Sequence, residues 1–387
     1  MGQLTELKQI RKIRNRKKNA KRFTILMILA VIFAALFLIL DKIKEFDVKT
    51  KIDDTIISMG NGPGFPIDIA GRDAISLFEV SKLPAIVNDS NIFVYNPKGK
   101  ATTNIQHGYN RPIAYSSNGR ILLFDLGGTK LKLHSLSKLL CEKKFDNPII
   151  NADISESGTF CVATESNNYV GEVVAFNKKG DQIFKWSSSK NVVTNASLSP
   201  DGNYLAVTAV NSNDGGLISF LYIFKINTGT EISMFSFDDE LPLDVTFKNS
   251  TQIVVLTDKS IKTVTNLGRK VGEYSFNDES IYDFDLTDSE NSTIVLGVHN
   301  QTGELNVVNL DIKNNVIGTF KTDKKISSVE IDDKGLCLTA NDEIIFYNYE
   351  GLELQKINAP LVRKALIIEN NLYYTTHNQV YKLNIKR

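Results

Sequence analysis

The sequence contains few of the residues that form covalent cross-links or metal sites. Only three cysteines occur in 387 residues, far apart and without a C-x-x-C pair, which argues against a disulfide framework and a zinc site. Cys161 and Cys337 stand at equivalent places in two apolar segments, so we interpret both as small buried residues. The histidines lack metal-ligand spacing, and we therefore predict no metal and no other cofactor. They are His107, His134, His299 and His377.

The sequence also lacks the motifs of common enzymes and the charge of a nucleic-acid-binding protein. It has no G-x-S-x-G, no H-E-x-x-H, no Walker A motif and no G-x-G-x-x-G that opens a helix. Lysine plus arginine number 45 and aspartate plus glutamate number 44, a formal net charge of +1. A nucleic-acid partner is therefore not expected, and a non-catalytic protein is favoured over an enzyme.

One long uncharged segment, residues 23–40, follows a basic N-terminal tail, residues 1–22. The tail holds nine Lys or Arg and one acid, whereas FTILMILAVIFAALFLIL contains no charge, proline or glycine. A helix of this length covers about 27 Å, near the hydrocarbon thickness of a bilayer. Without a small-residue cleavage site before Asp41, it is predicted to be an uncleaved anchor rather than a signal peptide. The basic tail predicts a cytoplasmic N-terminus and an extracytoplasmic C-terminal domain at the plasma membrane.

Residues 41–66 are predicted to form a stem and a neck. The segment FDVKTKI, residues 46–52, is interpreted as an extended strand that follows up to one more turn of the anchor helix. The segment GNGPGFP, residues 60–66, contains too much glycine and proline for a helix and predicts a turn-rich neck. The large domain is expected to occupy residues 67–387.

Beyond the neck the chain repeats a unit of about 35 to 50 residues, a period typical of solenoids and propellers. The clearest copies are ADISESGTFCVATE from residue 152, ASLSPDGNYLAVTA from 196, VTFKNSTQIVVLTD from 245, FDLTDSENSTIVLGV from 284 and VEIDDKGLCLTAND from 329. Each copy continues into two more short alternating strands with a tight turn. Because β-branched and aromatic residues dominate, the pattern predicts an all-β fold, a single β-propeller.

Weaker copies before and after these five bring the number of units to eight. Seven blades remains an alternative because the first unit is irregular. The last unit shows only three strands, so we expect FDVKTKI to supply its outer strand and close the ring. A closed ring leaves no long unpaired sheet edge, which predicts a monomeric domain.

Candidate binding residues gather on one face of the predicted ring. In a four-stranded blade, the loops between strands two and three emerge on the same side as the connections between blades. These loops are richer in Tyr, Asn, His and Gly than the opposite turns, a composition suited to adaptable polar recognition. Loops favour Asn and Gly in any case, so a purely structural role stays open. The candidates are His107, Tyr109, Arg111, Asp125, Tyr169, Asn211, Asp214 and His299.

Several segments together resemble an uncharacterised Firmicutes family of membrane-anchored propeller proteins, known as a domain of unknown function. They are the basic tail, the apolar segment, GNGPGFPIDIAG, QHGYNRP, LLFDLGGTKLKLHS and ASLSPDG followed by SFLYIFKI. The SPDG turn alone is similar to the repeats of WD40-like and TolB-like propellers, although turn chemistry by itself favours Asp and Gly there. The resemblance covers nearly the whole chain. It implies a Gram-positive envelope protein with the propeller outside the membrane, and it implies no activity.

Two functions follow from these observations. The first is a membrane-tethered, non-catalytic binding or scaffolding module for a protein or cell-envelope ligand. The second is an envelope hydrolase or lyase whose residues converge at the propeller axis. An apolar or Asn/Tyr-rich mouth would favour the first, and a converging cluster of acids, His or Tyr in the channel would favour the second.

Overall fold

The computed structural model describes residues 23–24, 26–29, 31, 48–69, 74–298, 303–340 and 342–385. The chain divides into two compact units, residues 1–56 and residues 57–387, each described here by itself.

In the first unit, the described residues between 23 and 31 are helical and their side chains are exposed. Residues 32–40, the rest of the predicted anchor, lie outside the described residues. Within the described part of the chain, no helix is both long enough and apolar enough to cross a membrane. Helix α2 (Val48–Ser58) follows and continues into the start of the second unit.

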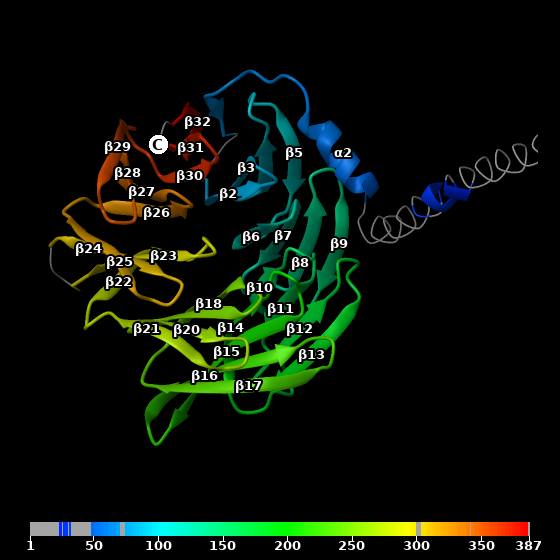
Figure 1. Cartoon of the computed structure of the whole chain (residues 1–387), viewed down its shortest axis with the longest axis vertical. Coiled ribbons are helices and arrows are strands. Elements are labelled where there is room, and N and C mark those ends of the chain that lie inside the picture. The colour runs from blue at the N-terminus through cyan, green and yellow to red at the C-terminus, as the bar shows by residue number, and fades with distance from the viewer. Residues whose placement is uncertain are drawn as a thin grey trace, which may run out of the picture. The chain divides into compact units, whose positions relative to one another are not determined.

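The second unit is an eight-bladed β-propeller, which confirms the predicted all-β fold and settles the blade number at eight (Figure 1). Each blade is a four-stranded antiparallel sheet, and its first strand lies innermost, against the first strands of neighbouring blades. The strands of blades one to four are β2 (Ser76–Val80), β3 (Leu83–Val87), β4 (Asn91–Tyr95), β5 (Ala101–Gln106), β6 (Pro112–Ser117), β7 (Arg120–Asp125), β8 (Lys130–Ser135), β9 (Leu139–Lys144), β10 (Ile149–Ile154), β11 (Phe160–Thr164), β12 (Gly171–Phe176), β13 (Gln182–Ser188), β14 (Val192–Leu198), β15 (Tyr204–Asn213), β16 (Gly216–Lys225) and β17 (Thr230–Asp238).

Blades five to eight continue in the same order, except that the last blade takes one strand from the start of the domain. Their strands are β18 (Pro242–Asn249), β19 (Gln252–Thr257), β20 (Ser260–Thr265), β21 (Lys270–Ser275), β22 (Ser280–Asp285), β23 (Asn291–Gly297), β24 (Leu305–Asp311), β25 (Val316–Thr322), β26 (Ile326–Asp332), β27 (Gly335–Ala340), β28 (Glu343–Tyr347), β29 (Glu353–Asn358), β30 (Lys364–Ile368), β31 (Asn371–Thr375), β32 (Gln379–Asn384) and β1 (Ile67–Asp68).

The ring closes through an N-terminal strand as predicted, but the segment assigned to it was wrong. Residues 48–52 of FDVKTKI belong to helix α2, and its first two residues lie outside the described part of the chain. The closing strand is β1, in which Ile67 pairs with Val380 of β32. Ile69 is buried beside it, in the cluster that joins blade eight to blade one. The closing strand thus follows the glycine-rich neck, where apolar residues alternate around exposed Asp68 and fit the blade boundary.

Hydrophobic clusters fill the spaces between neighbouring blades. In one of them, Val295 and Val307 of blade six pack against Val329 and Leu338 of blade seven. Cys161 and Cys337 are buried in such clusters, as predicted from their place in apolar strands. The predicted turn at residues 199–202 also forms. The Ser199 Oγ donates to an Asp201 carboxylate oxygen at 2.6 Å.

A β-bulge recurs near the start of the innermost strand in five consecutive blades, three to seven. In blade five the register shifts between Pro242 and Asp244, and in blade six between Ile281 and Asp283. Equivalent shifts occur in β10, β14 and β26. Because a bulge opposes two residues to one, it turns one side chain out of the regular alternation, here next to the propeller axis.

Candidate functional site

The predicted face exists, and we call it the loop face. It consists of the loops between strands two and three of each blade and the connections between blades. The segment between β5 and β6 carries His107, Tyr109 and Arg111, and the ends of β7, β11 and β15 lead to the remaining described candidates. Those candidates are Asp125, Tyr169, Asn211 and Asp214. His299 lies outside the described residues.

His107 and Tyr109 hold the first blade connection in place. The backbone N–H of Tyr109 donates to His107 Nδ1 at 3.1 Å, so Nε2 carries the hydrogen that it shares with the Asn88 carbonyl at 3.1 Å. Burial lowers the pKa of His107, which agrees with this neutral form. Tyr109 is only 6% exposed, and burial raises its pKa to about 12. The Tyr109 ring therefore offers little surface to a partner.

Asp125 also has a structural role. Its carboxylate accepts the backbone N–H of Arg111 at 2.9 Å, and its carbonyl accepts the N–H of Gly128 at 2.9 Å. A Cβ atom at Gly128 would lie 2.4 Å from the Asp125 carboxylate, so only glycine fits this turn. The Arg111 side chain remains exposed beside it.

The other three candidates differ in accessibility and role. Tyr169 is 47% exposed and can contact a partner. Asn211 donates to Asn191 Oδ1 at 2.8 Å, which ties it to the connection between blades three and four. Asp214 and Gly215 both have positive φ, +50° and +83°, and make the two-residue turn of the long β15–β16 hairpin.

Exposed apolar side chains, most of which the sequence did not single out, form the main feature of the loop face. They come from four consecutive blades, three to six, and they lie in loops or at the loop-face ends of inner strands. We call this set the apolar crescent. Its members, each 37–53% exposed, are Tyr169, Val170, Val192, Leu241, Leu243, Tyr282 and Val298.

The bulges place two of these side chains. Leu243 and Tyr282 are the extra residues at the register shifts of β18 and β22. A Cβ atom at Gly297 would lie 2.7 Å from the ring of Tyr282, so this glycine leaves room for the ring to lie across β23. Both exposed side chains therefore follow from backbone geometry rather than from a local sequence pattern.

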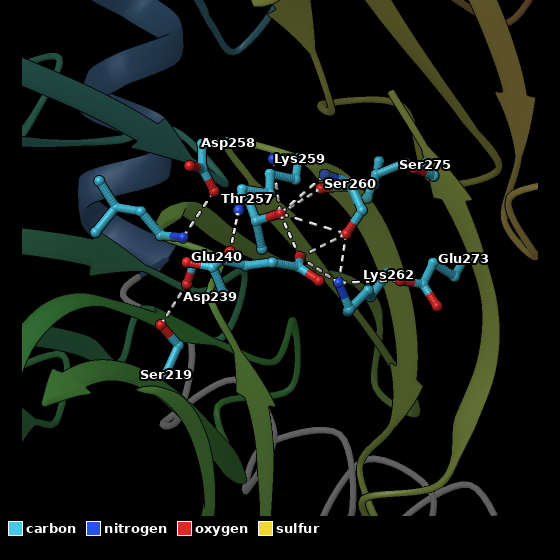
Figure 2. Close-up of polar contacts among 12 residues, drawn as sticks. Ser219, Asp239, Glu240, Thr257, Asp258, Lys259, Ser260, Lys262, Glu273 and Ser275 are labelled. Carbon is cyan, nitrogen blue, oxygen red and sulfur yellow. Dashed lines mark hydrogen bonds and ion pairs between the residues drawn. The ribbon is translucent and has the colours of Figure 1, made fainter. Parts of the chain in front are cut away.

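A buried polar network supports the centre of the crescent (Figure 2). The Glu240 carboxylate accepts hydrogen bonds from Thr257 and Ser260, both at 2.7 Å, and it pairs with Lys262. The next residue, Leu241, is held by two backbone contacts with Asp258. Its N–H donates to the Asp258 carboxylate at 2.7 Å, and its carbonyl accepts the Asp258 N–H at 3.0 Å. The segment that displays Leu241 is thus fixed before any partner binds.

The network does not form a nucleophile and base. Ser260 lies beside Lys262, but these residues are only 2% and 4% exposed, so a substrate cannot reach the hydroxyl. Lys262 also pairs with Glu273 at 3.1 Å. Burial opposes ionisation of Glu240, yet hydrogen bonds from Lys262 and its neighbours hold the pKa of this carboxyl below its usual value. The Lys262 side chain is thus held by two carboxylates rather than directed at an exposed hydroxyl.

The innermost strands of all eight blades line an axial cavity of about 700 Å³. Its lining includes acidic residues from blades one, three, five, six and seven, which are Glu79, Asp153, Glu156, Asp244, Asp285 and Glu330. Burial raises the pKa of Asp244 to about 7 and the pKa of Glu330 to about 8. Among the described residues, no group of His, Cys, Asp or Glu is arranged to hold a metal ion.

Some of these carboxylates link neighbouring blades. Asp153 accepts the backbone N–H of Leu198 at 2.8 Å, and Asp285 accepts that of Ile331 at 2.8 Å. The inner strands of adjacent blades belong to separate sheets, so the carboxylates supply hydrogen bonds that the sheets do not. This accounts for Asp153 and Asp285 without catalysis.

Comparisons with known proteins show the family and the fold. The model of a family of unknown function, DUF5711, matches residues 81–384. No curated protein matches the chain. The C-terminal WD40 domain of Sif2 is similar at 11% identity and a TM-score of 0.60, over 84% of this chain and 99% of that one. A eukaryotic initiation factor (14% identity, TM-score 0.58) is similar over 84% and 88% of the two chains. The Cps50 (Swd1) propeller of Myceliophteria thermophila (14%, 0.53) is similar over 76% and 97%. At these identities, the likeness concerns the fold alone.

Proposed function

Since the chain belongs to the DUF5711 family of unknown function, we propose its role from its own sequence and structure. It is a membrane-tethered, extracytoplasmic β-propeller that acts as a non-catalytic binding or scaffolding module, with a protein or cell-envelope ligand on the loop face. The apolar crescent is the single observation that carries the binding role.

Apolar side chains at this exposure are common singly, but a set gathered on one face is typical of an interaction site. The crescent contains two tyrosines, which provide large contact area at low entropic cost. Its rigid support by the Glu240 network reduces the ordering cost of binding. Acidic and polar loop residues lie near the crescent, as the polar rim lies around a binding hot spot.

The tether is supported by the uncharged run of residues 23–40 beside nine basic residues. Protease treatment of spheroplasts tests this part of the proposal. External protease should degrade the propeller and spare the basic tail, and a protected propeller would place the domain in the cytoplasm instead.

Crosslinking in native membranes with the full chain, followed by pull-down, tests the binding role. Leu241→Ser with Leu243→Ser should reduce the recovery of the crosslinked partner at least about tenfold, because both side chains sit at the centre of the crescent. The matched control is Leu352→Ser with Leu354→Ser, two exposed leucines near the outer turn of blade seven. Equal loss in both variants, or in neither, would contradict a partner site on the crescent.

The acids of the axial cavity favour the second function, a hydrolase or lyase with an axial active site. A carboxyl with a raised pKa can serve as a general acid near neutral pH, and both Asp244 and Glu330 have this property. In a hydrolase screen on cell-envelope polymers, Glu330→Gln should abolish any activity of the full chain. Activity that survives this substitution, together with Asp244→Asn, would remove the axial site from consideration.

A further inference from the structure

The face opposite the loop face carries a positively charged surface next to the neck. This turn face consists of the turns between strands one and two and between strands three and four of each blade. In blades one to three these turns span residues 81–82, 96–100, 118–120, 136–138, 155–159 and 177–181. We call these turns the basic turns. Apart from Lys82, their cations are Lys98, Lys100, Arg120, Lys138, Lys178 and Lys179.

These turns contain more cations than acids. The same turns contain only Glu156 and Asp181, while Lys82 pairs with Glu369 of blade eight at 2.5 Å. On the loop face of blades three to five the balance is reversed. Residues 165–170, 189–191, 214–215, 239–241, 258–259 and 276–279 contain seven acids and two lysines. The basic region of the turn face and this acidic region of the loop face therefore lie on opposite faces, although mostly in different blades.

Two of the cations meet at the boundary between blades two and three. A Cβ atom at Gly158 would lie 2.4 Å from Arg120 Nη1 and 3.2 Å from Lys178 Cβ, so both side chains start or end beside this glycine. A multivalent anion over this boundary can therefore contact both residues. The arrangement suits a multivalent anionic surface.

The neck packs against one of the basic turns, residues 96–100 of blade one. The Asn96 side chain donates to the carbonyls of Ser58 and Gly60 at 3.1 Å and 3.0 Å, and the Gly64 N–H donates to the Lys98 carbonyl at 3.1 Å. A Cβ atom at Gly62 would lie 2.1 Å from Lys100 N, so the neck is packed tightly on a basic turn. A tether that leads to this turn holds it within reach of the bilayer.

We propose that the basic turns of blades one to three are an interaction surface for the phosphate headgroups of an anionic lipid bilayer. The inference rests on the proposed tethering, which raises the local concentration of lipid at the neck. Docking by the turn face leaves the acidic loop face and the apolar crescent directed away from the membrane and open to a partner.

Lysine acetylation of the full chain in vesicles tests the proposal. The vesicles contain phosphatidylcholine alone or with about 30% phosphatidylglycerol, and mass spectrometry measures the acetylation rate at each lysine. In anionic vesicles, Lys98, Lys138, Lys178 and Lys179 should react at least about threefold more slowly relative to Lys190 and Lys259 of the loop face. About 0.5 M salt should remove the difference, because it screens charges beyond a few ångströms.

Substitutions separate lipid contact from a change of fold. Lys178→Gln with Lys179→Gln should abolish the protection of Lys98 and Lys138, whereas Lys190→Gln with Lys325→Gln on the loop face should leave it unchanged. Equal acetylation in the two lipids, or protection of the loop-face lysines instead, would overturn the proposal.

Flotation on pure phosphatidylcholine vesicles reports the tether separately, because neutral lipid offers no net charge to the basic turns. If the chain floats only with anionic vesicles and the lysines of the basic turns are protected, the tether is refuted and the proposed lipid-binding surface stands. A chain that floats on both, without protection, would refute the surface alone.

Discussion

The ammonium group of Lys248 donates a hydrogen bond to the backbone carbonyl of Leu286, one blade further along the chain, at 2.7 Å. The same group donates to the carbonyls of Asp288 and Asn291, also at 2.7 Å. Lys248 is 5% exposed, and burial lowers its pKa to about 8. One lysine thus satisfies three carbonyls in the first turn of blade six and joins that blade to blade five.

We expect Lys248→Met to lower the free energy of unfolding by about 2–4 kcal/mol, since the substitution leaves three carbonyls without their donor. Chemical denaturation of the wild type and the variant measures the change. The control is Lys179→Met, at an exposed turn, which should change stability by less than about 0.5 kcal/mol. Similar losses in both variants would show that the carbonyl contacts contribute little.

The acids of the axial cavity predict a pH dependence of stability. The pKa of Asp244 is raised from 3.8 to about 7 and that of Glu330 from 4.5 to about 8, mainly by burial. A carboxyl whose pKa is raised by folding stabilises the folded state at low pH. This contribution is lost as the pH rises through the pKa of the folded state. The free energy of unfolding should therefore fall by at least about 1 kcal/mol between about pH 5 and pH 8.

The double variant Asp244→Asn with Glu330→Gln should flatten this pH dependence, because neither amide titrates. Glu165→Gln, on an exposed loop, should leave the slope as in the wild type. Denaturation curves at several pH values give the comparison. A wild-type protein whose stability rises over this range would contradict the expectation.

The Glu240 network predicts a large cost for a small change. Glu240→Gln removes the carboxylate that pairs with Lys262 and leaves a buried lysine with a weaker set of acceptors, at a cost of about 3 kcal/mol. Glu343 pairs with half-buried Lys324 and with exposed Lys356, so Glu343→Gln should cost less than about 1 kcal/mol. Thermal unfolding measures the stability of both variants. A larger loss of stability in Glu343→Gln than in Glu240→Gln would contradict the structural importance of the Glu240 network.

Two tyrosines of the loop face should respond in opposite ways. Tyr109→Ala removes a buried ring and should destabilise the propeller by about 3–5 kcal/mol. Tyr169→Ala removes an exposed ring and should leave the melting temperature unchanged while it weakens partner binding by about 1 kcal/mol or more. Melting curves and binding measurements on the two variants test this division, which fails if Tyr169→Ala unfolds the domain.

The closing strand gives a test by deletion. A chain that lacks residues 1–58 keeps β1 and should melt near the temperature of the intact propeller. A chain that lacks residues 1–69 loses β1 and buried Ile69, and it should be destabilised by at least about 3 kcal/mol. Equal melting temperatures would show that the three C-terminal strands of blade eight suffice without β1.

Local patterns in the sequence determined the blades and several packing positions. The copies that begin at residues 152 and 196 alternate apolar and polar residues over single strands and carry their own turn residues, so strand and turn are encoded within a few positions. Cys161 could be placed in the core for the same reason, since its whole strand is apolar. The loop face followed from strand order alone, because successive antiparallel strands must turn at alternate ends.

Only the tertiary structure decided which loop-face residues are exposed. Tyr109 is buried because its ring packs in the cluster between blades one and two, whereas Leu243 and Tyr282 are exposed because bulges turn them out of register. The closing strand was misplaced because pairing with β32 depends on where the neck brings the chain, about 310 residues away in sequence. Burial, bulge and ring closure each depend on contacts between distant segments, so the alternation within a single strand cannot specify them.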